Sequence, residues 1–211
     1  MDVSQSAGCL PVDADAWGVD ALVFTGHKGL FGVPGTGGFY IRRSVALCPL
    51  QFGGTGRNSA QLTYPDGDFE YEVGTRNAPG IAALNAGVNY VRRIGIPAIA
   101  ARERRLMHRL YAGLARAKAA VVYGNDGQTL GPALSFNIRG LPPSDVAYIL
   151  YGSYGIVVRT GLHCAPLIHQ CLGTQRNGTV RVSVSYLTAE AEIDTCIKAV
   201  CEIGRSADAS S

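Results

Sequence analysis

The chain has 211 residues, of which 47% are hydrophobic and 17% charged, a composition that can bury a core and excludes a disordered chain. The net charge of +3 comes from scattered basic residues, and the densest run, Arg102-Glu103-Arg104-Arg105, is typical of a solvated helix face, which argues against nucleic-acid binding. No apolar run is long enough to span a membrane, no signal peptide opens the sequence, and the six cysteines form no Cys-x-x-Cys pair, so we expect a cytoplasmic protein without a membrane partner, disulfide bonds or a metal site.

The first part of the chain predicts two strands around a glycine-rich loop. Residues 20–25 are a short apolar run typical of a buried strand, and residues 37–42 predict a second strand. The loop 26–35 between them contains four glycines and one proline. Residues 51–76 are rich in Gly, Asn, Asp and Thr and predict a long irregular loop, which in a compact domain is usually functional or wraps a partner.

The rest of the chain alternates helical and strand patterns, with Pro97 as an interruption. Expected in chain order are helices over 80–94 and 98–119, a strand over 132–138, a helix over 143–151, strands over 156–158 and 179–185, and a helix over 188–203 capped by Thr188. This is an α/β pattern with a hinge near residues 97–120. We therefore expect two domains, 1–100 and 101–211.

The sharpest chemical signal is Thr25-Gly26-His27-Lys28-Gly29-Leu30, at the end of the first predicted strand. A lysine at the carboxyl end of a strand can reach the crevice where α/β sheets bind ligands, and as a neutral amine it can attack an aldehyde. Thr25 and His27 could donate hydrogen bonds to a phosphate, together with loop amides. An ordinary surface lysine in a turn is an alternative that the hexapeptide leaves open.

Two further charged residues have a possible use near such a lysine. Asp2, in Asp2-Val3-Ser4-Gln5, is a carboxylate that could keep a pyridine nitrogen protonated, although a solvent-facing aspartate is the simpler interpretation. Arg181 lies on an alternating strand, where an inward-facing guanidinium needs an anion such as a substrate carboxylate. A surface salt bridge is the alternative for this arginine.

Cys164 lies in the segment 159–166, after a glycine-containing loop and before a predicted short helix. The helix N-terminus and the neighbouring Arg159 and His163 would favour its thiolate form. A zinc site built from His163, Cys164 and His169 is disfavoured because the first two are adjacent and would have to converge from opposite directions. A buried, inert cysteine is the other alternative.

Taken together, seven segments in the same order resemble the class V aminotransferase group, specifically its cysteine desulfurase-like branch. The segments are 2–8, 24–30, 35–38, 53–56, 72–77, 159–166, and 173–174 followed by 178–183. The resemblance covers nearly the whole chain. It departs from the family at Gly32-Val33-Pro34-Gly35, where Gly-Pro-x-Gly is usual, and at Arg76, where proline is frequent.

The resemblance implies an α/β fold of the fold-type I pyridoxal-phosphate enzymes, with part of the mostly parallel large domain and a small C-terminal α/β domain. For the cofactor, the resemblance implies that Lys28 binds it covalently, with Asp2 on the pyridine nitrogen and Gln5 on the phenolic oxygen. It implies that Thr25 and His27 bind the phosphate, and that Thr75 binds the phosphate of the partner subunit in a homodimer. For the substrate, it implies Cys164 as the sulfur-accepting nucleophile and Arg181 with Arg159 at the carboxylate.

The function implied is conversion of L-cysteine to L-alanine, with the sulfur held as a persulfide on Cys164 before it passes to an acceptor protein. A selenocysteine lyase or another class V reaction is an alternative, because these enzymes share the lysine and the arginine. We also expect the sequence to lack about the first half of the family chain, which carries the residue that stacks on the cofactor ring. A truncated, non-catalytic fragment is therefore a further alternative.

Overall fold

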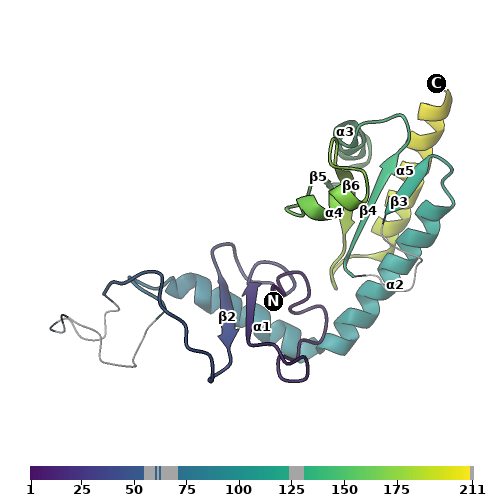
Figure 1. Ribbon diagram of the computed structural model, residues 1–211. Helices are drawn as coiled ribbons and strands as arrows, with labels where there is room; N and C mark the ends of the chain where they lie inside the picture. Colours follow the sequence, from purple (N-terminus) through teal and green to yellow (C-terminus); the bar gives the residue numbers. More distant parts are fainter. Residues whose placement is uncertain (55–59, 61, 63–70, 124–130, 210–211) are drawn as a thin grey trace. The chain divides into compact units, whose positions relative to one another are not determined.

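The computed structural model describes residues 1–54, 60, 62, 71–123 and 131–209. Thr55 and Gly56 of the predicted motif, and much of the predicted loop 51–76, lie outside the described residues. The chain forms two compact units, Met1–Ile96 and Pro97–Ser211, which are treated separately here (Figure 1). Within the described residues, no helix is both long enough and apolar enough to cross a membrane.

Unit 1 contains an antiparallel pair of strands, β1 (Ala21–Thr25) and β2 (Gly37–Ile41), which lie side by side in Figure 1. Both predicted strands are confirmed to within one residue. The first residues of the chain run parallel to β1: the amide of Val3 donates to the carbonyl of Val23 at 2.9 Å, and the amide of Val23 donates to the carbonyl of Met1 at 3.0 Å. The parallel pairing in this unit is limited to this bridge between Asp2 and Val23 in the part of the chain that is described.

Helix α1 (Ala78–Ile94) supports the glycine-rich loop after β1. A Cβ added at Gly87 would overlap the backbone of Leu30 and Phe31, so only a glycine lets the helix approach the loop this closely. Phe31 also packs edge-to-face on Tyr90, with ring centroids 5.4 Å apart. The helix therefore packs against Leu30 and Phe31, in the part of the loop that follows Lys28.

Unit 2 is a four-stranded antiparallel sheet packed against helices (Figure 1). Its elements are α2 (Ile96–Ala115, which begins one residue earlier), β3 (Ala120–Tyr123), β4 (Ala133–Ile138), α3 (Pro143–Tyr154), β5 (Arg159–Gly161), α4 (Pro166–Cys171), β6 (Thr179–Ser183) and α5 (Glu190–Ala209). The strand order is β3-β4-β6-β5, so the two strands with the candidate arginines, β5 and β6, are neighbours.

The core of unit 2 explains why these sequences fold as they do. Alternate residues of β4 are buried, namely Leu134, Phe136 and Ile138, because a strand directs every second side chain to the same face. The helices complete this core with Leu106, Met107, Leu110 and Leu114 from α2, Val146 and Leu150 from α3, and Ile193, Cys196, Ala199, Val200 and Ile203 from α5. The helices thereby cover the face of the sheet that carries these buried side chains.

The predicted strand over 156–158 is wrong, and the strand lies instead at Arg159–Gly161. Helix α3 ends at a left-handed Gly155 (φ 66°), and the amide of Ile156 donates back to the carbonyl of Leu150. The helix end therefore takes the first of these backbone donors, and pairing with β6 begins only at Arg159. Val157 is left 80% exposed.

Other elements differ from the prediction as well. Helix α1 begins at Ala78, two residues before the predicted start, and ends at Ile94 as predicted, where the amide of the capping Gly95 donates to the carbonyl of Val91. Strand β3 was not predicted, because its four residues adjoin a helical pattern with no turn signal between them. Helix α5 begins at Glu190 with Ala189 in the cap position, and the amide of Ala189 donates to the Glu192 carboxylate; the hydroxyl of Thr188 accepts from Ser185 instead.

Candidate active site

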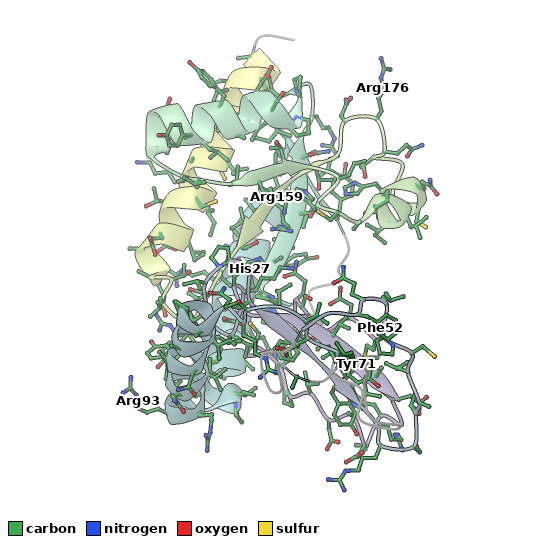
Figure 2. The ribbon with its side chains drawn as sticks, turned by 90° about the vertical axis from the view of Figure 1, so that its left-hand side faces the viewer. His27, Phe52, Tyr71, Arg93, Arg159 and Arg176 are labelled. Carbon is green, nitrogen blue, oxygen red and sulfur yellow. The ribbon has the colours of Figure 1, made fainter. Side chains whose placement is uncertain are left out.

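Lys28 lies in a tight loop at the carboxyl end of β1. The amide of Gly26 donates to the carbonyl of Thr36, and the amide of Gly32 donates to the carbonyl of Gly26, both at 2.8 Å, so the two ends of the loop are tied together. Within it, the amide of Phe31 donates to the carbonyl of Lys28 at 3.0 Å. His27 and Lys28 are exposed at the end of the strand, where Figure 2 labels His27. This is the position from which a lysine can reach a ligand.

The segment that carries Asp2 and Gln5 packs directly on the lysine loop. Gly8 has a φ of 85°, and a Cβ at this position would overlap the carbonyl of Gly29. A Cβ at Gly29 would in turn overlap the sulfur of Cys9. The close approach of Gly8 and Gly29 therefore places the segment 2–9 beside the residue that follows Lys28. In the sequence, only the two glycines gave a sign of this contact.

We expect Gly8→Ala to destabilise unit 1 by about 2 kcal/mol or more, because a left-handed backbone and a backbone clash act together. Gly35→Ala is the matched control: its φ is 79°, but the nearest atom to an added Cβ is 4.0 Å away, so only the backbone term of about 1 kcal/mol applies. Urea unfolding followed by the fluorescence of Trp17, the single tryptophan, measures both variants. Equal losses in the two variants would contradict the close approach.

The carboxylate of Asp2 is held in its charged form. Hydrogen bonds from Ser4, one of them from its amide at 2.7 Å, are the main cause that lowers the pKa of Asp2; burial raises it by less, and the charge of Lys28 lowers it by less still. Lys28 is thus close enough to Asp2 to influence its charge. An ionised carboxylate beside the lysine is what a protonated pyridine nitrogen requires.

The hydroxyl of Thr25 supports the predicted phosphate contact. Its oxygen is buried, and it has no hydrogen-bond partner among the residues that the structure describes. A buried hydroxyl without a partner is costly, so its position at the start of the lysine loop fits a bound anion such as a phosphate. Thr75 is exposed in the segment before α1, next to Arg76, which forms an ion pair with Glu72 at 3.3 Å. These residues fit the pyridoxal phosphate implied by the sequence.

In unit 2, two arginines face each other across neighbouring strands. Arg159 on β5 and Arg181 on β6 are partners in the antiparallel register. Burial, followed by the charge of Arg159, lowers the pKa of Arg181, and the Nε atom of Arg181 is buried without a hydrogen-bond partner among the described residues. Two adjacent like charges and an unused donor are features that an anion would satisfy. In Figure 2, Arg159 lies over the strands, whereas Arg176 projects outward from the loop before β6.

Cys164 lies beside this arginine pair on a tight turn. Its sulfur is 3.6 Å from Nη2 of Arg159, and the side chain is exposed. His163 (φ 53°) and Cys164 (φ 61°) are both left-handed, and the amide of Ala165 donates to the carbonyl of Leu162 at 2.9 Å, which is a type I′ turn. A left-handed backbone raises the conformational free energy of a residue other than glycine by roughly 1–2 kcal/mol, and Cys164 is one of the two residues concerned here. The short helix expected after the cysteine is confirmed as α4.

His163 is directed to the sheet. Its Nε2 atom is 3.0 Å from the carbonyl oxygen and 3.1 Å from the hydroxyl of Thr179 on β6. Sequence reasoning placed His163 near Cys164 but missed this contact, because it depends on how β5 and β6 pair. No group of three or more His, Cys, Asp or Glu side chains is arranged to hold a metal ion in the described ranges.

The candidate residues therefore form two groups, one in each unit. Unit 1 holds Asp2, Gln5, Thr25, His27, Lys28 and Thr75, and unit 2 holds Arg159, Cys164 and Arg181. Within unit 1, the Asp2 segment and the lysine loop are in contact. Within unit 2, both arginines and the cysteine adjoin one another. The chemistry of the first group suits an aldehyde cofactor with a phosphate, and that of the second suits an anionic substrate and a thiol nucleophile.

Comparison with known proteins agrees with this chemistry. Residues 1–196 match the model of the aminotransferase class-V family. A probable cysteine desulfurase of Methanothermobacter thermautotrophicus is 38% identical over 199 residues, which are 92% of this chain and 50% of that protein. The chain spans about half the length of the curated relatives that it matches.

Solved structures agree as well. The apo structure of a cysteine desulfurase from Thermococcus onnurineus NA1 matches with a TM-score of 0.87 and 35% identity, over 97% of this chain and 52% of that one. The cysteine desulfurase CsdA of Escherichia coli matches with a TM-score of 0.84 and 26% identity, over 95% of this chain and 50% of that one. The α/β, fold-type I class expected from the sequence is thereby confirmed.

Proposed function

Because the chain belongs to the class V aminotransferase family, we propose that it acts as a pyridoxal-phosphate-dependent cysteine desulfurase, converting L-cysteine to L-alanine with the sulfur held as a persulfide on Cys164. The observation that carries the proposal is the position of the Cys164 sulfur, 3.6 Å from the Arg159 guanidinium, which is itself paired in register with Arg181. The arginine pair would bind the substrate carboxylate, and the adjacent thiol would then attack the substrate's own sulfur.

Six residues of unit 1 would hold the cofactor. Lys28 would bind it covalently, with the Asp2 carboxylate on the pyridine nitrogen and Gln5 on the phenolic oxygen. Thr25 and His27 would bind its phosphate, and Thr75 would reach the phosphate of the partner subunit in a homodimer. The ionised state of Asp2 and the unpartnered hydroxyl of Thr25 support this assignment. Pyridoxal phosphate supplies, when bound, a ring that accepts the electron pair left at the substrate α-carbon.

The chain's own residues would carry the remaining steps. Arg181, with Arg159, binds the substrate carboxylate, and Lys28 Nζ takes the α-proton. The thiolate of Cys164 then attacks the substrate sulfur, so a sulfur–sulfur bond forms as the carbon–sulfur bond breaks. The electron pair of the broken bond remains on the β-carbon of the substrate, which takes up a proton, and the proton held by Lys28 returns to the α-carbon, so that the product leaves as alanine. Cys164 is left as a persulfide, which a thiol of an acceptor protein would remove.

The two units would correspond to the domains expected from the sequence. Residues 1–100 would belong to the large cofactor-binding domain and residues 101–211 to the small C-terminal domain.

The six cysteines are all free thiols, which fits a reducing cytoplasm.

The proposal is tested by incubating the protein with pyridoxal phosphate and L-cysteine. We expect alanine and persulfide in equal amounts during the first turnover, with the extra sulfur on Cys164 by mass spectrometry. L-selenocysteine is assayed in parallel. Alanine from selenocysteine alone would replace the proposal by a selenocysteine lyase, and cofactor binding without alanine from either substrate would overturn both.

A further inference from the structure

The turn that presents Cys164 lacks the residues that usually form it. A type I′ turn needs two consecutive left-handed residues, and glycine or asparagine is normally found there. Here the two positions are His163 and Cys164. Such a conformation persists only where surrounding contacts impose it, so some interaction of unit 2 must hold the turn.

His163 makes the contact that can do so. A backbone carbonyl only accepts hydrogen bonds, so the 3.0 Å contact with Thr179 is a hydrogen bond in the tautomer of His163 that carries its proton on Nε2. Thr179 is fully buried. Asn137 of β4 forms hydrogen bonds with the residues on both sides of Thr179. Its Nδ2 donates to the carbonyl of Gly178 at 3.1 Å, and its Oδ1 accepts from the amide of Val180 at 3.3 Å. The acceptor of the histidine is therefore a rigid point of the sheet.

The surroundings of His163 argue against a role as a charged group. Burial is the main cause that lowers the pKa of His163, followed by the charge of Arg181, with His169 and Arg159 acting in the same direction and the Thr179 hydrogen bond opposing them. The other ring nitrogen, Nδ1, is buried without a hydrogen-bond partner among the described residues. The lowered pKa favours the neutral imidazole, which does not stabilise a neighbouring thiolate by charge, and the contact with Thr179 points to a geometric contribution.

We propose that His163 is a positioning residue: by donating from Nε2 to the carbonyl of Thr179, it pins the turn that holds the Cys164 sulfur against the Arg159 guanidinium. The inference rests on the proposed function of Cys164 as the sulfur acceptor and adds the residue that sets its geometry. In this arrangement the Arg159 guanidinium supplies the positive charge beside the sulfur, and His163 keeps the sulfur of Cys164 close to that charge.

The test measures the reactivity of Cys164 without cofactor or substrate. The protein is treated with iodoacetamide, and labelling is followed by mass spectrometry; Cys164 and Cys171 share the tryptic peptide 160–176, so fragment ions assign the label and Cys171 serves as an internal reference. We expect His163→Ala to slow labelling of Cys164 relative to Cys171 by about fivefold, the factor produced by loss of one net hydrogen bond. His163→Gln, whose side-chain amide can donate to the same carbonyl, should restore most of the rate.

A positioning role also predicts coupling to Arg159. Arg159→Gln should slow Cys164 labelling in the wild-type background and have little further effect in the His163→Ala background. His108→Ala, a histidine of α2 outside the turn, is the matched control and should leave the ratio unchanged. Circular dichroism establishes that each variant is folded. Additive effects of the two substitutions, or no rescue by glutamine, would overturn the proposal; because no turnover is involved, a failure of the desulfurase proposal would appear separately, in the persulfide assay.

Discussion

Replacement of Cys164 with serine is expected to reduce persulfide and alanine formation from L-cysteine by at least about 1000-fold, the order of loss seen when covalent enzymes lose their nucleophile. Binding of pyridoxal phosphate should be unchanged, because Cys164 and the proposed cofactor ligands lie in different units of the chain. Serine differs from cysteine by one atom and is only slightly smaller. Its hydroxyl, however, is hardly ionised near neutral pH and is a poor nucleophile towards sulfur.

The measurement combines alanine determination with mapping of persulfide sulfur by mass spectrometry. Cys171→Ser is the matched control, because Cys171 is also exposed and lies at the end of α4, seven residues further along the chain. We expect this control to retain full activity. Cys196 is a poor competitor, since burial raises the pKa of its thiol to about 11. Persulfide on Cys171, or undiminished alanine release by Cys164→Ser, would show that the sulfur acceptor has been assigned to the wrong residue.

Replacement of Lys28 with alanine is expected to abolish covalent attachment of pyridoxal phosphate. The amine of Lys28 is exposed at the end of β1, in a loop closed by backbone hydrogen bonds at both ends, and beside the ionised carboxylate of Asp2. We expect the protein to develop a visible absorbance band with added pyridoxal phosphate, and borohydride to trap the cofactor on the peptide that contains Lys28. In Lys28→Ala, both signals should disappear.

Lys118→Ala is the control for non-specific reaction, since aldehydes also react with surface lysines. Lys118 lies between α2 and β3 in unit 2, and its loss should change neither the band nor the trapped peptide. If Lys28→Ala and Lys118→Ala both retain the band, Lys28 is not the cofactor lysine. This outcome is independent of turnover, so it separates cofactor binding from desulfuration.

The sequence by itself determined the local elements around the candidate site. An apolar run bounded by glycine is sufficient to predict β1, and alternation is sufficient to predict β6, because strand periodicity and glycine punctuation are local properties. The candidate residues could also be chosen from local pattern, since Lys28 follows a strand and Cys164 precedes a short helix. The family relationship was predicted from seven motifs in order, and their order and spacing are also properties of the sequence.

Only the tertiary structure decided which of these residues act on one another. The pairing of β5 with β6 sets Arg159 opposite Arg181 and brings His163 to Thr179, and neither contact has a local signal because the partners are 16 or more residues apart. The same pairing shows why residues 156–158, although rich in β-branched side chains, form no strand: the end of α3 takes their first backbone donor. Strand propensity is a property of the residue, whereas a strand exists only where a neighbour supplies its hydrogen bonds.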